Sequence, residues 1–91
     1  MPNRVRVPVQ LRALTNGEEV ISASGNSVLE IIEDIESRYP GVKDRICEPD
    51  GRVRRFVNIF VNEEDIRFLD NLQTPISDQD EVSIIPAIAG G

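Results

Sequence analysis

Hydrophobic and polar residues alternate near the start of the chain. Over Arg4–Arg12 every second residue is aliphatic: Val5, Val7, Val9 and Leu11. This period of two predicts a half-buried strand. Pro8 has no N–H, so we expect an edge or a locally unpaired position there. Asn16-Gly17 is typical of a hairpin turn, and Glu19–Ala23 is expected to return as an antiparallel strand.

A helical pattern follows this hairpin. Ser27 and Glu30 have the spacing of a capping box. Apolar residues then recur at helical spacing, at Val28, Ile32, Ile35 and Tyr39. The pattern predicts an amphipathic helix of about three turns that ends at Pro40-Gly41. Its acidic side is interpreted as a solvated face, formed by Glu30, Glu33, Asp34 and Glu36. A short helical turn is expected over Lys43–Ile46.

Alternation returns in the second half of the chain. Arg55–Asn62 is the strongest strand signal. One face of this strand is expected to carry Val57, Ile59 and Val61, and the other Phe56, Asn58 and Phe60. A short strand is expected at Ile66–Phe68, a loop over Leu69–Gln79 and a last strand at Val82–Ile85.

The element order is therefore β-β-α-β-β-β. Strands before and after one helix indicate an α+β fold, with a mixed sheet and one main helix packed on one face. This is the order expected of a ubiquitin-like β-grasp, in which the first and last strands lie side by side. We predict a β-grasp domain over residues 1–85 and a flexible C-terminal tail over residues 86–91.

Composition narrows the classes of function. The chain has 91 residues, a length that suits one domain, and a formal net charge of −6, which argues against nucleic acid as a partner. It has no histidine and one cysteine, so zinc sites and Cys–His chemistry are not expected. Cys47 is interpreted as a small structural residue. No apolar run reaches the roughly 20 residues of a membrane span and no signal-peptide pattern is present, so we expect a cytoplasmic protein.

The chain closes on IIPAIAGG, over residues 84–91. Glycine is poorly suited to holding a fixed conformation, so Gly90 and Gly91 do not obviously stabilise a fold. One reading is a frayed end without a role. The other is a tip that a partner uses, since six residues from Pro86 reach at most about 20 Å when extended.

Several pieces of the second half resemble the small sulfur carriers of the MoaD/ThiS type. They are Val61-Asn62, Thr74-Pro75-Ile76, Asp78 to Val82, Pro86 and Ala89-Gly90-Gly91. Within that family, RFVNIFVNEEDIRF and the tail IIPAIAGG are most similar to the carriers that serve cysteine synthesis. Gln79 departs from the pattern, because the family commonly has glycine in the turn before the last strand.

The resemblance implies a role for the tail. The carboxylate of Gly91 would be adenylated by an ATP-dependent, E1-like activating enzyme and converted to a thiocarboxylate. A sulfur-accepting enzyme such as a cysteine synthase would then receive the sulfur. The chain itself would be a protein substrate and sulfur donor, not an enzyme, with no bound cofactor and no metal. Gly90 and Ala89 would give the tail clearance in a narrow tunnel.

The outer face of the predicted sheet is a candidate partner surface. If Val57 and its alternate neighbours face the helix, Phe56 and Phe60 lie on the open face, and Ile85 should join them. Other functions of the same activated glycine stay open: the small subunit of molybdopterin synthase, or a ubiquitin-like protein modifier. A plain interaction module with an idle tail is a further alternative.

Overall fold

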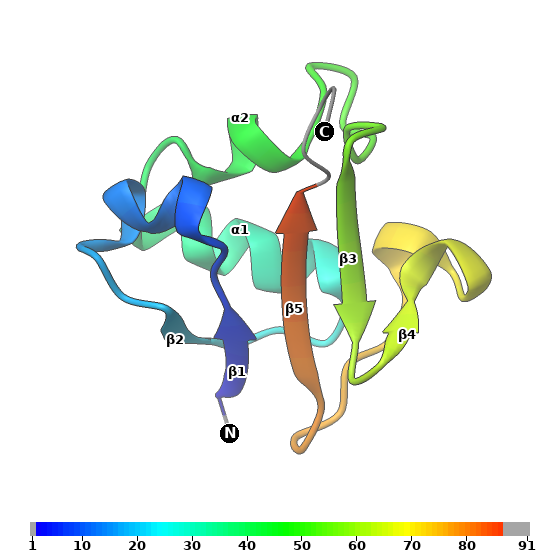
Figure 1. The fold of residues 1–91 in the computed structure, drawn as a ribbon. Helices are drawn as coiled ribbons and strands as arrows, with labels where there is room; N and C mark the ends of the chain where they lie inside the picture. The colour runs from blue at the N-terminus through cyan, green and yellow to red at the C-terminus, as the bar shows by residue number, and fades with distance from the viewer. Residues whose placement is uncertain (1, 87–91) are drawn as a thin grey trace.

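A computed structural model describes residues 2–86 of the chain. It contains one five-stranded sheet in the order β2-β1-β5-β3-β4 (Figure 1). The strands are β1 (Asn3–Arg6), β2 (Val20–Ala23), β3 (Val57–Val61), β4 (Glu64–Asp65) and β5 (Glu81–Pro86). The α-helices are α1 (Val28–Arg38) and α2 (Val42–Ile46), and the 3₁₀ helices are η1 (Val9–Thr15), η2 (Ile66–Phe68) and η3 (Asn71–Gln73).

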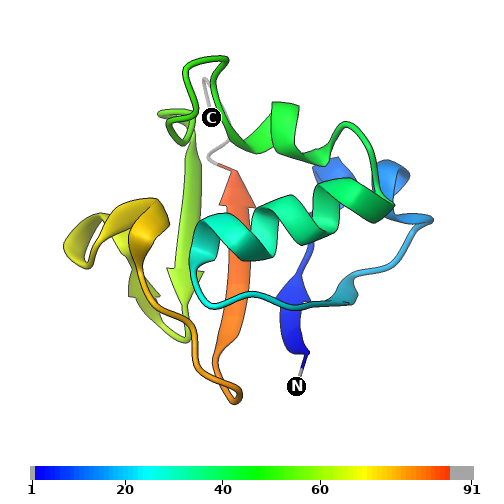
Figure 2. The same ribbon diagram turned by 180° about the vertical axis from the view of Figure 1, so that it is seen from behind.

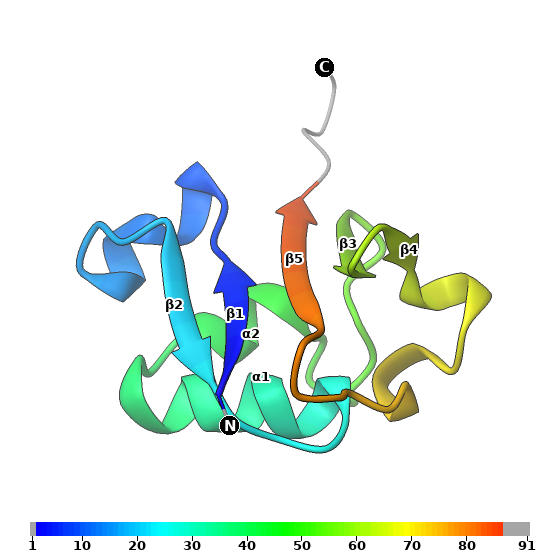
Figure 3. The same ribbon diagram turned by 90° about the horizontal axis from the view of Figure 1, so that it is seen from below.

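The sheet is mixed. β1 runs parallel to β5, whereas β2 is antiparallel to β1 and β3 is antiparallel to β5. Figure 2 shows α1 crossing one face of the strands, and Figure 3 shows α1 and α2 on that same side. The first and last strands therefore lie side by side beneath one main helix, which confirms the α+β, β-grasp prediction.

The buried face of α1 packs against the inward residues of the sheet. One core cluster contains the predicted set Val5, Val7, Val28, Ile32, Ile35, Val57, Ile59 and Val82. Ile31, which is not part of the apolar series Val28, Ile32 and Ile35, is also fully buried. The reason is that α1 contacts α2 and η3 as well as the sheet, which widens its buried face.

The capping box of α1 is present with one change. The Ser27 hydroxyl accepts a hydrogen bond from the Glu30 N–H at 3.2 Å. The Glu30 carboxylate reaches back to the N–H of Asn26 at 2.9 Å, one residue earlier than the capping-box pattern requires. Both bonds satisfy N–H groups near the start of the helix, so the sequence signal is confirmed.

The strand predicted over Arg4–Arg12 is wrong beyond Arg6. Pro8 is extended, with φ −70°, and its carbonyl accepts a hydrogen bond from the Leu11 N–H at 3.0 Å, which begins η1. Val9 is 70% exposed, although the alternation predicted it to be buried. A proline that cannot continue the strand's hydrogen bonding turns the chain into a 3₁₀ helix at this point.

The strand predicted at Ile66–Phe68 is also wrong, because these residues form η2. The Asp65 carboxylate accepts a hydrogen bond from the Arg67 N–H at 2.9 Å and caps this helix. Ile66 is 2% exposed and Phe68 is 86% exposed, whereas a strand would have placed both side chains on one face. A local side-chain hydrogen bond therefore overrides the apolar alternation.

The described helices include none that is long and apolar enough to cross a membrane.

Candidate functional site

Strand β5 holds the C-terminal part of the chain at the centre of the sheet (Figure 1). Its last cross-strand pair is Val57 with Pro86. Pro86, which the sequence analysis placed in the tail, is thus a residue of β5. The predicted reacting residue Gly91 and its neighbours Gly90 and Ala89 lie outside the described residues.

A side-chain network fixes the start of β5. The Asn62 side chain donates to the Asp80 carboxylate at 3.0 Å and accepts from the Glu81 N–H at 3.1 Å. Asn3, only 3% exposed, donates to the carbonyls of Ser77 and Asp80 at 2.7 and 2.8 Å. These bonds tie the turn before β5 to both neighbouring strands and set its register. Asn62 was part of a recognised sequence motif, whereas Asn3 was not predicted, because its only signal was a polar residue at the start of a strand.

Gln79 lies in this same turn. The non-glycine residues with positive φ in the described chain are Asn16, Asn62 and Asn71, so Gln79 has no left-handed backbone. The turn is closed by a hydrogen bond from the Asp80 N–H to the Ser77 carbonyl at 3.0 Å. The departure from glycine at position 79 therefore carries no conformational cost here.

Phe60 and Ile85 share the open face of the sheet, as predicted. The register of β3 and β5 pairs Phe60 with Ser83 and Asn58 with Ile85. Phe60 and Ile85 are therefore diagonal neighbours, a geometry in which long side chains reach each other. Ile85 is 50% exposed and Phe60 is half-buried, so apolar surface is available on this face.

Phe56 approaches from a turn, and its prediction as a strand residue is wrong. β3 begins at Val57, whose N–H donates to the Arg54 carbonyl at 2.9 Å. The Phe56 ring is 56% exposed, and the guanidinium carbon of Arg55 lies 5.6 Å from its centre. Phe56 is thus an exposed aromatic residue that directly precedes Val57, and Val57 is the residue of β3 that pairs with Pro86.

Charged side chains lie beside this apolar surface. Arg4 and Arg6 alternate with buried Val5, so both project from the open face of β1. The Arg6 Nε lies 2.9 Å from a Glu81 carboxylate oxygen, and the Arg4 Nε lies 3.8 Å from the other. The face therefore combines an apolar side near β3 with a charged side near β1.

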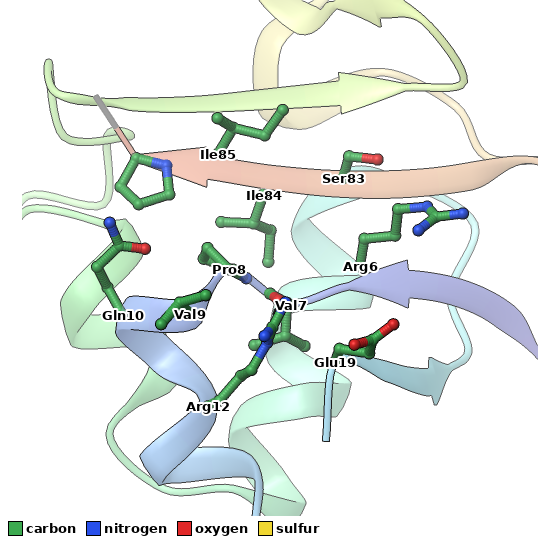
Figure 4. A pocket seen from close by; sticks show the side chains of 11 residues that line it. Arg6, Val7, Pro8, Val9, Gln10, Arg12, Glu19, Ser83, Ile84 and Ile85 are labelled. Carbon is green, nitrogen blue, oxygen red and sulfur yellow. Dashed lines mark hydrogen bonds between the residues drawn. The ribbon is translucent and has the colours of Figure 1, made fainter. Parts of the chain in front are cut away.

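A groove of about 450 Å³ adjoins the C-terminal half of β5 (Figure 4). It lies between that strand and the segment that leaves β1 and forms η1. Its lining includes Pro8, Val9, Arg12, Ile84, Ile85 and Pro86. The Arg12 Nε donates to the Val7 carbonyl at 3.1 Å, and this arginine has no carboxylate partner in the ion pairs of residues 2–86.

Thr74-Pro75-Ile76 serves the fold. The Thr74 carbonyl accepts from the Val28 N–H at 3.0 Å, and the Ile76 N–H donates to the Asn26 carbonyl at 3.0 Å. The Thr74 hydroxyl accepts from the Asp70 N–H at 3.0 Å. This segment therefore holds the start of α1.

Cys47 is 3% exposed within the core, as expected of a structural residue. Burial raises the pKa of its thiol, which disfavours the reactive thiolate. Residues 2–86 contain no group of three potential ligands that could hold a metal ion. Within this part of the chain, the exposed surface around β5 is the candidate site.

Comparisons with known proteins agree with this geometry. The sequence model of the ThiS family matches residues 5–91. The sulfur carrier protein CysO of Mycobacterium tuberculosis strain H37Rv is 46% identical over 89 residues, which cover 96% of each chain. The molybdopterin synthase sulfur carrier subunit of the same strain is 34% identical over 77 residues, covering 85% of this chain and 78% of the relative.

Structural similarity points the same way. A crystal structure of the Amycolatopsis orientalis BexX/CysO complex contains a chain that superposes with a TM-score of 0.91 at 44% identity. The superposition covers 97% of this chain and 98% of that one. The fold, the motifs around β5 and the match over residues 5–91 show that the chain belongs to the ThiS family and is a ubiquitin-like sulfur carrier of the MoaD/ThiS type, similar to CysO.

Proposed function

We propose that the chain carries sulfur on the terminal carboxylate of Gly91, for cysteine biosynthesis. An oxygen of this carboxylate attacks the α-phosphorus of ATP on an activating enzyme, which forms an acyl-adenylate and releases pyrophosphate. Hydrosulfide (HS⁻) from the sulfur source then attacks the acyl carbon, and AMP leaves with the electrons of the broken C–O bond. The added sulfur loses its proton, so a thiocarboxylate remains, and the accepting enzyme takes the sulfur from it.

The similarity to CysO is the observation that carries this proposal. It extends over 96% of both chains at 46% identity, and the family match includes the terminal Gly90-Gly91. The relative's name gives it as a sulfur carrier protein. The resemblance of RFVNIFVNEEDIRF and IIPAIAGG to the carriers that serve cysteine synthesis favours that pathway for this chain.

Elementary chemistry explains why a carrier needs an activating partner. A terminal carboxylate is ionised at neutral pH and is a poor electrophile. An acyl-adenylate supplies a better leaving group, but it must be kept from water inside an enclosed site. Glycine allows close backbone approach in such a site, which is the role proposed for Gly90.

The described part of the chain supports this role by its rigidity. β5 is held on both sides, by β1 and by β3, as far as Ser83, and by β3 alone up to Pro86. A tail that starts from a fixed strand is presented to a partner at lower entropic cost than one that starts from a loop. The apolar face of Phe60 and Ile85, with Phe56 at its border, is the proposed docking surface for the activating enzyme.

Intact mass of the chain tests the proposal. The full chain is incubated with ATP, a sulfur source and the activating enzyme of the same organism. Conversion to a thiocarboxylate replaces one oxygen by sulfur and raises the mass by about 16 Da. No gain in mass, with an enzyme that activates its own known carrier, would contradict the proposal.

A second candidate is the small subunit of molybdopterin synthase, which the 34% identity to such a subunit favours. Both functions use the same thiocarboxylate and differ in the acceptor. Transfer of the sulfur to a cysteine synthase, measured as cysteine formed per thiocarboxylate consumed, supports the first. Stable copurification with a larger synthase subunit supports the second. Protein-sized adducts in cells would instead indicate a ubiquitin-like modifier.

A further inference from the structure

The parallel ladder between β1 and β5 stops before β5 does. Its paired positions are Arg4 with Glu81, Val5 with Val82 and Arg6 with Ser83. On the other side, β5 remains paired with β3 as far as Pro86. Residues 84–86 therefore have a strand on one side and the groove of Figure 4 on the other.

The direction of the backbone groups in β5 follows from one bond. The Asn62 N–H donates to the Glu81 carbonyl at 2.7 Å, so the Glu81 carbonyl faces the β3 side. Backbone groups of alternate residues in a strand turn to opposite neighbours. The even-numbered residues Ile84 and Pro86 therefore turn their carbonyls toward the groove.

Pro8 explains why the ladder stops. Continuing the register of β1 and β5 places residue 8 beside Ile85, where its N–H would meet the Ile84 carbonyl. Proline has no N–H, and the chain leaves the sheet here to form η1. The Val7 N–H turns the other way, toward the Glu19 carbonyl at 2.8 Å. Within residues 2–86, no loop or side-chain donor reaches the carbonyls of Ile84 or Pro86.

We infer that this short open edge of β5 receives an extended main-chain segment of the activating enzyme, which adds a strand in the space that β1 vacates at Pro8. This inference rests on the proposed function, since it states how the activating enzyme binds the strand that precedes the tail. An exposed strand edge offers unpaired carbonyls to such a segment, and adjacent pockets select its side chains.

The surroundings of the edge specify the occupant. The exposed side chains of Val9 and Ile85, 70% and 50% exposed, flank the groove and favour an apolar residue between them. Arg12 lines the same groove without a carboxylate partner in the described chain, whereas Arg6 is paired with Glu81. The docking segment should therefore be extended, with one apolar side chain at the groove and an acidic side chain beside Arg12.

The edge is suited to transient docking. It is short, and it adjoins the open face that carries Phe60 and Ile85, so one partner can cover both surfaces together. Main-chain pairing along β5 would also hold the strand in line as the tail leaves it. Partner contact on the open face alone would leave the direction of the tail less constrained.

Val9→Glu tests the groove without disturbing the core, because Val9 is 70% exposed. A carboxylate there blocks the groove and repels the acidic segment. We expect at least a tenfold higher dissociation constant for the activating enzyme by calorimetry, and a similar rise in KM. Phe68→Glu, at an 86% exposed position in η2, is the matched control and should change binding less than twofold.

The carbonyl ¹³C signal of Ile84 provides a direct readout of main-chain pairing. On saturation with the enzyme it should move downfield as it accepts a hydrogen bond, and this shift should be lost in Val9→Glu. Unchanged affinity of Val9→Glu together with an unmoved Ile84 signal would overturn the inference. Concentration-dependent dimers of the free chain that Val9→Glu abolishes would also overturn it, by assigning the edge to a second copy. Thiocarboxylate formation by the unaltered chain is recorded alongside, so a failure of the proposed function is recognised separately.

Discussion

Asn62 and Glu81 are joined by two hydrogen bonds of different kinds. The Asn62 backbone N–H donates to the Glu81 carbonyl at 2.7 Å, and the Glu81 N–H donates to the Asn62 side-chain oxygen at 3.1 Å. Asn62 also has a left-handed backbone, with φ 59°. Asparagine suits this position because its side chain tolerates that conformation and supplies the acceptor.

Asn62→Ala should therefore destabilise the chain. It removes the acceptor of the Glu81 N–H and places a Cβ-bearing residue without a compensating bond in a left-handed conformation. We expect a loss of about 1–3 kcal/mol in the free energy of unfolding, measured by urea denaturation. Asn62→Gly relieves the backbone strain but not the lost bond, and should lie between alanine and the parent. Equal stability of all three chains would show that the turn does not set the register of β5.

Elements were predicted correctly from the sequence where the hydrophobic spacing fitted only one kind of secondary structure. The alternation through Val57, Ile59 and Val61 fixed both the strand and its buried face, and the capping box located the start of α1. It failed at Val9 and at Phe68, where the same alternation continued into 3₁₀ helices. A missing N–H at Pro8 and a side-chain cap from Asp65 decided those segments, and neither effect is visible in hydrophobic spacing.

The candidate site was likewise predicted in part from the sequence. Alternation predicted that Phe60 and Ile85 share a face, and they do. The groove was not predicted, because it depends on where β1 ends relative to β5 rather than on any motif. The feature of the sequence that indicates the groove is Pro8, which interrupts a strand pattern. We interpreted Pro8 as an unpaired position on the first strand. The structure shows that β5 is the strand left unpaired.

Ile32→Ala tests the core assignment of α1. Ile32 is 1% exposed and belongs to the core cluster, so truncation should leave a cavity. We expect a loss of about 2–5 kcal/mol in the free energy of unfolding. Phe68→Ala, at an 86% exposed position, should cost less than about 0.5 kcal/mol. A comparably small loss for Ile32→Ala would mean that α1 does not pack as described.

The hydrogen bonds of Glu36 predict that the free energy of unfolding depends on pH. Its carboxylate accepts hydrogen bonds from the N–H groups of Lys43 and Gly41, which lower its pKa below the ordinary value of 4.5. A lowered folded-state pKa contributes stability that is fully present above pH 4.5 and is lost as the pH falls through the folded value. Glu36→Gln should therefore be least stable relative to the parent near neutral pH, with the gap closing on acidification.

Glu33→Gln is the matched control for this measurement. Glu33 is on the same helix and lies 3.7 Å from the Lys43 ammonium, as an exposed ion pair of little value to stability. Its loss should change the urea midpoint only slightly. A gap between parent and Glu36→Gln that stays constant with pH would indicate that the Glu36 charge does not hold the start of α2.

Phe60→Asp tests the open face of the sheet as a docking surface. Phe60 projects away from α1, so the variant should fold, as judged by circular dichroism and thermal unfolding. In a complex its carboxylate would be buried without a partner, at a cost of about 1–3 kcal/mol. The dissociation constant for the activating enzyme should therefore rise several-fold to about a hundredfold. Phe68→Asp in η2 should bind the activating enzyme as tightly as the parent. Unchanged affinity of a folded Phe60→Asp would remove this face from the interface.

Deletion of Gly91 tests the reacting group itself. The shortened chain would present its carboxylate one residue earlier, up to about 3.5 Å from the position that meets ATP. A misplacement of 1 Å in a reacting group can lower a rate by about 100-fold, so formation of the thiocarboxylate should be nearly abolished. The urea midpoint should not change, because the core cluster draws on residues Val5 to Ile84. Adding one residue after Gly91 should block conversion in the same way unless a protease removes it. If the shortened chain gains sulfur as fast as the full one, judged by intact mass over time, the carboxylate of Gly91 is not the carrier group.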